Sequence, residues 1–221
     1  LGLVWIALLV LLAVFAPFLA TSLPLLAGRG GETFSPVLEH LTPGDTTLLA
    51  LFFTGVVLLL RRARPRMWVA AMGAVLVVAG GLSAAFVSPP AVTVYAEYRA
   101  ADYDWVVRAP VPYSPKDYLR DYGETGLEGP LESGERTHWL GTGENGADVL
   151  ARMVHASRIA LGIGFIATGI AMAIGIVIGG LMGYFSGVVD IIGMRLVEIF
   201  EAVPTLFLLL TFVAFFGRSL Y

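Results

Sequence analysis

The sequence lacks cysteine altogether, contains one lysine (Lys116), and has few charges of either sign. Charged residues make up 14% of its 221 positions and hydrophobic residues 57%, with a mean hydropathy of +0.80. The missing cysteines exclude a disulfide framework, a thiolate metal site and a cysteine nucleophile. A net charge of −3 with no extended basic surface argues against a nucleic-acid binder. Because soluble domains carry about 25% charged residues, the composition predicts a membrane protein rather than a soluble, fibrous or disordered one.

Five apolar stretches approach the length of about 20 residues that a helix needs to cross a bilayer. They cover residues 1–20, 46–60, 67–88, 159–189 and 204–217. We therefore expect an all-α, polytopic membrane helical bundle with about five transmembrane helices and an irregular external loop region. Residues 1–20 could alternatively be a signal peptide, but they lack a basic n-region and are long for one. The chain starts with Leu1 and its last apolar stretch nearly reaches Tyr221, so we interpret it as a fragment.

Four arginines between the second and third stretches predict the orientation. Arg61, Arg62, Arg64 and Arg66 lie within six residues, and arginine-rich short loops stay in the cytoplasm. Alternation then places the N-terminus and residues 188–201 inside, and residues 21–45 and 89–157 outside. A nucleic-acid binding site and an import signal are weaker interpretations of this cluster.

Residues 89–157 hold 11 acidic and 6 basic side chains, a net charge of −5. Prolines and glycines divide this stretch into short pieces, in which residues 92–95 and 105–107 could form strands. It is either a solvent-exposed cap or a docking surface for a partner, and charge alone favours the cap.

No constellation in the chain predicts catalysis. Residues 141–146 match the spacing G-x-G-x-x-G, but no buried strand precedes them, so we expect a turn rather than a nucleotide site. Asp148 or Asn145 could cap a short helix that follows. His138 and His155 are too isolated to suggest a zinc site. We predict that the chain is not an enzyme and binds no cofactor or metal.

Glycines recur every four residues in the fourth apolar stretch. Gly175, Gly179, Gly183 and Gly187 would lie along one stripe of a helix, where small residues allow close packing in a membrane. Static helix packing is the simpler interpretation, and a seam that slides during transport is the alternative.

A short charged segment follows this stretch. We expect residues 188–202 to form an amphipathic helix containing Asp190, Arg195 and Glu198, with Arg195 and Glu198 at facing positions. Pro204 would then begin the next helix.

Several of these residues together resemble a known family. The runs His138-Trp-Leu-Gly-Thr142, Gly146-Ala-Asp148 to Arg152, and Ser157-Arg158 resemble the segment that opens the shared domain of ABC-type permeases of dipeptide and oligopeptide importers, second permease subunit. Residues 188–204, including Asp190, Arg195, Glu198 and Pro204, resemble the cytoplasmic segment of the same family. The resemblance is clear over about residues 138–217.

The chain departs from the family pattern at three points. Gly143 and Ala147 stand where the family usually has aspartate and arginine, so contacts of those side chains are absent or replaced, for example by Glu144. An extra hairpin at about residues 46–88 precedes the outer loop. The family's ATPase-coupling segment is not found in these 221 residues.

The resemblance implies a permease subunit of a multi-pass bacterial inner-membrane importer for peptides or similar small solutes. It further implies a second permease subunit as heterodimer partner, cytoplasmic ATPase subunits that carry ATP and Mg, and an external solute-binding protein. Alternatives are an integral membrane enzyme and a non-transporting structural subunit.

The expected organisation has four parts. These are a first transmembrane helix at 1–20, an external loop plus extra hairpin at 21–88, an external loop region at 89–157, and the start of the permease transmembrane domain at 158–221.

Overall fold

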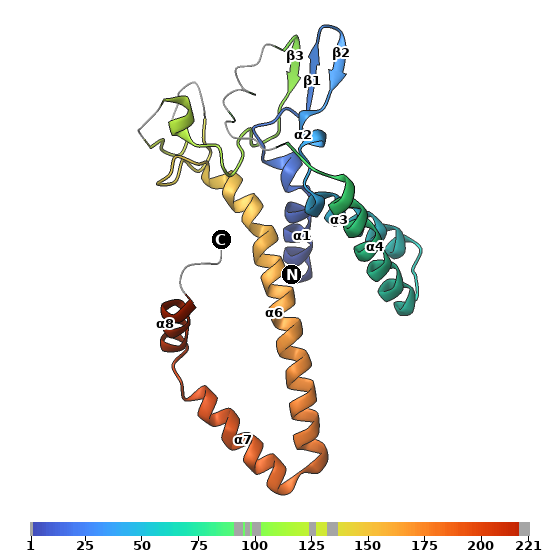
Figure 1. Ribbon diagram of the computed structural model, residues 1–221, viewed down its shortest axis with the longest axis vertical. Coiled ribbons are helices and arrows are strands. Elements are labelled where there is room, and N and C mark those ends of the chain that lie inside the picture. The colour runs from blue at the N-terminus through green and yellow to red at the C-terminus, as the bar shows by residue number, and fades with distance from the viewer. Residues whose placement is uncertain are drawn as a thin grey trace. The chain divides into compact units, whose positions relative to one another are not determined.

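A computed structural model describes residues 2–90, 95, 98, 103–123, 127–131 and 137–216. The chain divides into two compact units, Leu1–Ile163 and Gly164–Tyr221. The first unit contains the outer-loop residues and the beginning of α6, and the second contains the rest of α6 and the helices that follow (Figure 1).

Helices dominate the described chain, as predicted. The long ones are α1 (Gly2–Leu19), α3 (Pro43–Leu60), α4 (Pro65–Phe86) and α6 (Val149–Phe185). All four are long and apolar enough to cross a bilayer, and a fifth span is possible if α7 (Gly187–Glu201) and α8 (Thr205–Phe216) together form one. This confirms the fold class, a polytopic helical membrane protein.

Two helices begin earlier than their apolar stretches indicate. Helix α3 starts at Pro43 rather than residue 46, because Thr42 and Asp45 form a reciprocal capping box at its first turn. Helix α6 starts at Val149 rather than residue 159, so the short helix expected after Asp148 is the first turn of a helix 37 residues long. In both cases charged side chains satisfied by the protein extend a helix beyond its apolar part.

The last span also differs from the prediction. Helix α8 has 12 residues, about 18 Å, which is too short to cross a bilayer by itself. It follows α7 after a bend of 71°. The prediction of a helix over residues 188–202 is confirmed by α7, and Pro204 lies in the bend, immediately before α8.

A small antiparallel sheet joins the loop after α1 to the loop before α6. Its order is β2 (Glu32–Phe34), β1 (Leu26–Arg29) and β3 (Trp105–Val107). Gly30 and Gly31 have positive φ angles of 60° and 86°, which allow the two-residue turn between β1 and β2. Strand β3 confirms one expected strand, and residues 92–94 of the other lie outside the described residues. A short helix, α2 (Pro36–Glu39), follows β2.

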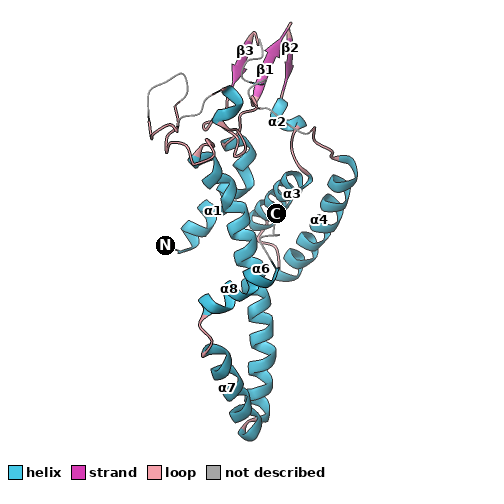
Figure 2. Cartoon of the chain, turned by 60° about the vertical axis from the view of Figure 1, so that its left-hand side comes forward, coloured by secondary structure: helices cyan, strands magenta, loops and turns pink. Residues whose placement is uncertain are grey.

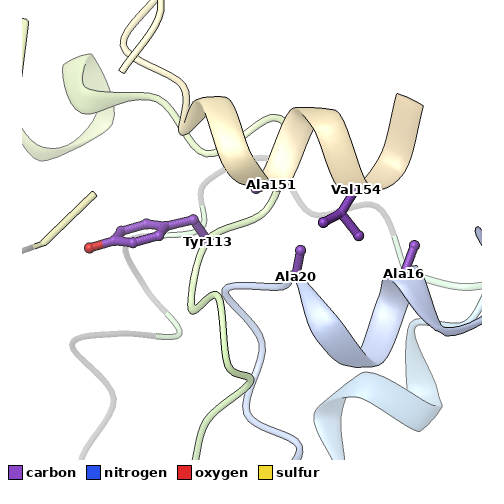
Figure 3. Close-up of a cluster of buried hydrophobic side chains, with 5 residues drawn as sticks. All are labelled: Ala16, Ala20, Tyr113, Ala151 and Val154. Atoms are coloured by element: carbon purple, nitrogen blue, oxygen red, sulfur yellow. The ribbon is translucent and has the colours of Figure 1, made fainter. Parts of the chain in front are cut away.

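The small core lies where α1 ends and α6 begins. Ala16, Ala20, Ala151, Val154 and Tyr113 form a buried cluster there (Figure 3). Four of the five side chains are small, which lets the two helices approach closely. Helix α3 packs on α1 and, as an antiparallel hairpin, on α4 (Figure 2).

Candidate functional site

Most of the residues predicted as the outer-side motif form one compact loop before α6. They are His138, Gly141, Thr142, Gly146 and Asp148, whereas Arg152 and Arg158 lie within α6. Thr142 N–H donates to the Glu128 carbonyl at 2.9 Å, and Glu128 N–H donates to Thr142 Oγ1 at 2.9 Å. Gly146 N–H donates to the Gly143 carbonyl at 2.7 Å, and Val149 N–H donates to the Gly141 carbonyl at 3.1 Å. The glycines make a turn, as expected, and residues 137–140, the described residues directly before them, form no strand.

Two of these glycines are required by the backbone. Gly141 and Gly146 have φ angles of 71° and 73°, in the left-handed region that side chains disfavour. A Cβ atom at Gly141 would lie 2.8 Å from the Glu128 carbonyl oxygen, and one at Gly146 would lie 2.9 Å from Leu119 Cβ. The turn therefore packs tightly against residues 119 and 128, including the 3₁₀ turn η1 (Leu119–Tyr122).

His138 is the buried centre of this loop. Its ring stacks on Tyr113 with centroids 4.0 Å apart, and its side chain is 3% exposed. Nδ1 lies 2.8 Å from Asp148 Oδ2, and Nε2 lies 3.1 Å from Glu128 Oε2. Because an ionised carboxylate can only accept, Nδ1 carries a proton. His138 thus joins three separate chain segments.

Asp148 connects this loop to the long helix. Its Oδ1 accepts the Ala151 N–H at 2.6 Å, which caps α6, while its Oδ2 faces His138. The expected cap is therefore confirmed at Asp148. Arg152 lies one turn further along α6, and a Cβ atom at Gly143 would lie 3.5 Å from its Nη1. Ala147 is fully buried and Glu144 is exposed.

Arg158 forms a second cluster, in which it contacts two other helices. Its Nε donates to the Ala13 carbonyl at 2.5 Å and its Nη2 to the Val14 carbonyl at 3.2 Å, both in α1. Its Nη1 pairs with Oδ1 of Asp45 in the first turn of α3. The other oxygen of Asp45 accepts the Thr42 N–H at 2.8 Å and the Thr42 hydroxyl at 2.7 Å. Arg158 thus ties the extra hairpin to α1 and α6.

A cavity of about 310 Å³ lies beside this ion pair. Its lining includes Asp45, Arg158, His155, His40 and Lys116. His155 Nε2 lies 2.8 Å from the Ala20 carbonyl, and His40 Nδ1 lies 2.7 Å from the Pro36 carbonyl. Since carbonyl oxygens only accept, both of these ring nitrogens carry the proton.

The loop after α1 and the loop before α6 are also joined by buried polar side chains. Ser22 N–H donates to Ser114 Oγ at 2.9 Å, Ser114 N–H donates to Ser22 Oγ at 2.8 Å, and the Ser22 hydroxyl donates to Asp117. Burial raises the pKa of the nearby Tyr95 phenol, and a hydrogen bond with Ser114 opposes the rise. These contacts hold the loop after α1 against the loop before α6.

The remaining predicted residues lie in the second unit, in α6 and α7 and immediately before α8. Gly175, Gly179 and Gly183 share α6. Apart from their chain neighbours and the backbone of their own helix, no described atom lies within 4 Å of where their Cβ atoms would be. Gly187 is the first residue of α7 and has a φ of 58°, so it does not continue the stripe. In α7, Arg195 Nη1 lies 2.6 Å from Glu198 Oε2, as the spacing indicates, and Asp190 lies in the first turn. The packing role stays a prediction.

Sequence reasoning missed the partners that come from distant segments. Tyr113 and Glu128 contact His138, and Asp45 contacts Arg158, from positions 10 to 113 residues away in the chain. The one available signal was the pair Thr42 and Asp45, which has the spacing of a capping box before an apolar run. Within the described residues, no group of three or more His, Asp or Glu side chains could hold a metal ion.

Comparison with known proteins finds relatives over part of the chain. An inner membrane ABC transporter permease protein, YejE of Escherichia coli, is 43% identical over 75 residues, 34% of this chain and 22% of the relative. A dipeptide transport system permease protein, DppC of Alkalihalophilus pseudofirmus, is 33% identical over 108 residues, 49% of this chain and 36% of the relative. A glutathione transport system permease protein, GsiD of Pectobacterium atrosepticum, is 34% identical over 110 residues, 50% of this chain and 35% of the relative.

The similarity confirms the resemblance inferred from the motifs. The chain spans about a fifth to just over a third of the length of these relatives. No protein-family model and no solved structure matches the chain.

Proposed function

We propose that the chain is part of a permease subunit of an ABC importer that forms the pathway for peptides or similar small solutes. The observation that carries the proposal is the loop from His138 to Asp148, whose sequence resembles permeases. In this loop the buried pair of His138 and Asp148 is hydrogen-bonded, and Asp148 caps α6. Similarity to three proteins named as transport permeases supports it.

The partners follow from the same proposal. A second permease subunit completes the pathway, cytoplasmic ATPase subunits bind ATP and Mg, and an external binding protein delivers the solute. The N-terminus and the arginine-rich turn lie in the cytoplasm, and residues 89–157 lie outside. Catalysis takes place on the partner subunits, because the role of this chain is to line the pathway and transmit movement.

The outer loops have a physical role in this proposal. The sheet, the paired serines and the His138 loop bind the loop after α1 to the loop before α6. A binding protein that docks on these loops would therefore act on α1 and α6 together. We infer that residues 89–157 are a docking surface rather than a passive cap, with Asp104 and Glu144 among their exposed carboxylates.

Uptake by intact cells tests the proposal. The full-length gene is deleted from its host, and ATP-dependent uptake of a radiolabelled dipeptide, an oligopeptide and glutathione is measured. We expect at least one of the three to lose uptake and to regain it when the full-length gene is restored. The permease should also co-purify with an ATPase subunit.

Two results would contradict the proposal. Unchanged uptake of all three solutes would argue against the solute class, and the absence of an ATPase in the purified complex would argue against an ABC importer. A non-transporting structural subunit would give the first result but could still co-purify with other membrane proteins.

A further inference from the structure

The turn between α3 and α4 carries four exposed arginines. Arg61, Arg62, Arg64 and Arg66 are all exposed, and among the residues that the structure describes none of them forms an ion pair. Four unpaired guanidinium groups within six residues repel one another unless an anion lies close to them. No carboxylate of the described residues forms an ion pair with this turn.

The backbone gathers these side chains at one end of the hairpin. Arg61 N–H donates to the Val57 carbonyl at 3.0 Å and Arg62 N–H to the Leu59 carbonyl at 3.0 Å, which ends α3. Arg62 then adopts a φ of 48°, and Pro65 begins α4. At the other end of the hairpin, Ser83 Oγ lies 3.0 Å from Thr47 Oγ1. The arginine turn is therefore the end that lies farthest from the outer loops.

The length of α3 places this turn at the depth of the lipid headgroups. Helix α3 has 18 residues, or about 27 Å, and its first turn is polar. Its apolar part, residues 46–60, is only about 22 Å long, against a hydrocarbon core of about 30 Å. Asp45 in the first turn is held by Arg158, which fixes that end. The shortfall draws Arg61 and Arg62 toward the headgroups, where long side chains reach the phosphates.

We propose that the arginine turn, defined as Arg61, Arg62, Arg64 and Arg66, is a binding site for the headgroups of anionic phospholipids. Guanidinium groups bind phosphate oxygens in a bidentate manner, and weak hydration suits them to this interface. Trp68, in the first turn of α4, is half-buried and belongs to the residue type that anchors helices at headgroup level. The site would anchor the arginine end of the extra hairpin, whose opposite end is held by the ion pair of Asp45 with Arg158.

Retention of lipid by the purified protein tests this site. The full-length protein is reconstituted in vesicles of phosphatidylcholine with phosphatidylglycerol, extracted in mild detergent, and its retained lipids are counted by native mass spectrometry. We expect the Arg64→Gln and Arg66→Gln variants each to lower the ratio of retained phosphatidylglycerol to phosphatidylcholine by up to about fivefold. Each variant keeps three arginines, so the orientation rule still applies.

Two controls separate a specific site from general charge effects. Arg29→Gln removes an exposed arginine from the last position of β1 and should leave the ratio unchanged. The Arg64→Lys variant keeps the charge and should retain most of the phosphatidylglycerol. Equal ratios for Arg64→Gln and the unaltered protein, or an equal loss in Arg29→Gln, would overturn the proposal. So would displacement of the lipid by inorganic phosphate alone, which would indicate a site for soluble anions.

Discussion

At the scale of single residues, His138 organises the loop that precedes α6. The contribution of its side chain to stability depends on contacts with three neighbours. Tyr113 covers one face of the ring, and Asp148 and Glu128 face its two nitrogens. Leaving the Asp148 carboxylate, which is 1% exposed, buried without its partner would cost about 1–3 kcal/mol.

Substitution at Asp148 separates the two roles of this residue. Asp148→Asn can still cap α6 but weakens the contact with His138, whereas Asp148→Ala loses both. We expect Asp148→Ala to destabilise the protein by about 2–4 kcal/mol and Asp148→Asn by less. Thermal unfolding of the detergent-purified protein measures the difference. Glu144→Ala, at an exposed neighbouring carboxylate, should change little. Equal effects of Asn and Ala would show that the His138 contact carries the whole stabilisation.

The motif glycines give a second prediction at this scale. Gly141→Ala and Gly146→Ala place a Cβ in a left-handed backbone and against close neighbours, so each should cost about 1–2 kcal/mol or more. Gly143→Ala is the matched control, because its φ is not positive and its nearest contact would be 3.5 Å away. Folded yield and unfolding temperature measure both effects. A similar loss in all three variants would contradict the backbone argument.

An acidic residue at position 143 is expected to increase the stability of the protein. A Cβ there would lie 3.5 Å from Arg152 Nη1, and no ion pair of Arg152 occurs among the described residues. Gly143→Asp should therefore add an exposed ion pair worth about 0.2–1 kcal/mol that weakens as salt is added. The same variant in an Arg152→Gln background should show no gain in unfolding temperature.

Much of the loop could be anticipated from the sequence, but its partners could not. Asp148 before an apolar helix is a local signal, as is a glycine turn, and both were confirmed. The contacts of His138 with Tyr113 and Glu128 depend on how two other loops fold back. Contacts between distant segments follow no fixed sequence separation, so a single sequence does not predict them.

At the scale of elements, one buried ion pair adds to the packing of α3 on α1 in fixing the extra hairpin to the rest of the first unit. The side chains of Asp45 and Arg158 are 6% and 19% exposed, so solvent screens them little. Removing one partner from a buried pair costs about 3–5 kcal/mol, mostly because the other charge is left alone.

A double-mutant cycle measures this attachment. Asp45→Asn and Arg158→Gln should each destabilise the protein, and the double variant should lose less than their sum by about 1–3 kcal/mol. The exposed pair Arg195 and Glu198, with side chains 74% and 53% exposed, is the matched control and should couple by less than about 1 kcal/mol. The free energy of unfolding in detergent gives the coupling energy of each pair, and the rate of proteolysis of the hairpin is a second readout. Additive losses at Asp45 and Arg158 would contradict the attachment.

The same ion pair explains why the sequence misplaced two helix starts. Charge was used to end the apolar stretches at residues 46 and 159. In the structure these charges are inside helices, where Asp45 closes a capping box and Arg158 binds α1 carbonyls. A charged residue marks the end of a membrane span only where it would otherwise face lipid. Here the protein supplies polar partners for both charges, so the helices continue past them. The Gly30 and Gly31 turn, by contrast, was a readable hairpin signal that the sequence interpretation passed over.

At the scale of the whole molecule, the structure bears on which loops share a side. Strands β1 and β3 pair residues 26–28 with 105–107, and Ser22 pairs with Ser114, so the loop after α1 and the loop before α6 lie together. Alternation of the helices requires the same, since two spans separate these loops. The side of the membrane on which they lie stays a prediction from the arginines.

Single cysteines can decide that side, because the chain has none of its own. Glu144→Cys places a thiol on an exposed residue of the outer motif loop, and Ala63→Cys places one within the arginine turn. Ser114 is unsuitable, because it is 5% exposed and hydrogen-bonded to Ser22. In intact cells an impermeant thiol reagent should label position 144 and leave position 63 unlabelled until the cells are permeabilised. The reverse pattern would place the arginine turn outside, against the positive-inside rule. It would also put the His138 loop on the cytoplasmic face, where an external binding protein could not reach it, so the proposed orientation and the docking role would be lost together.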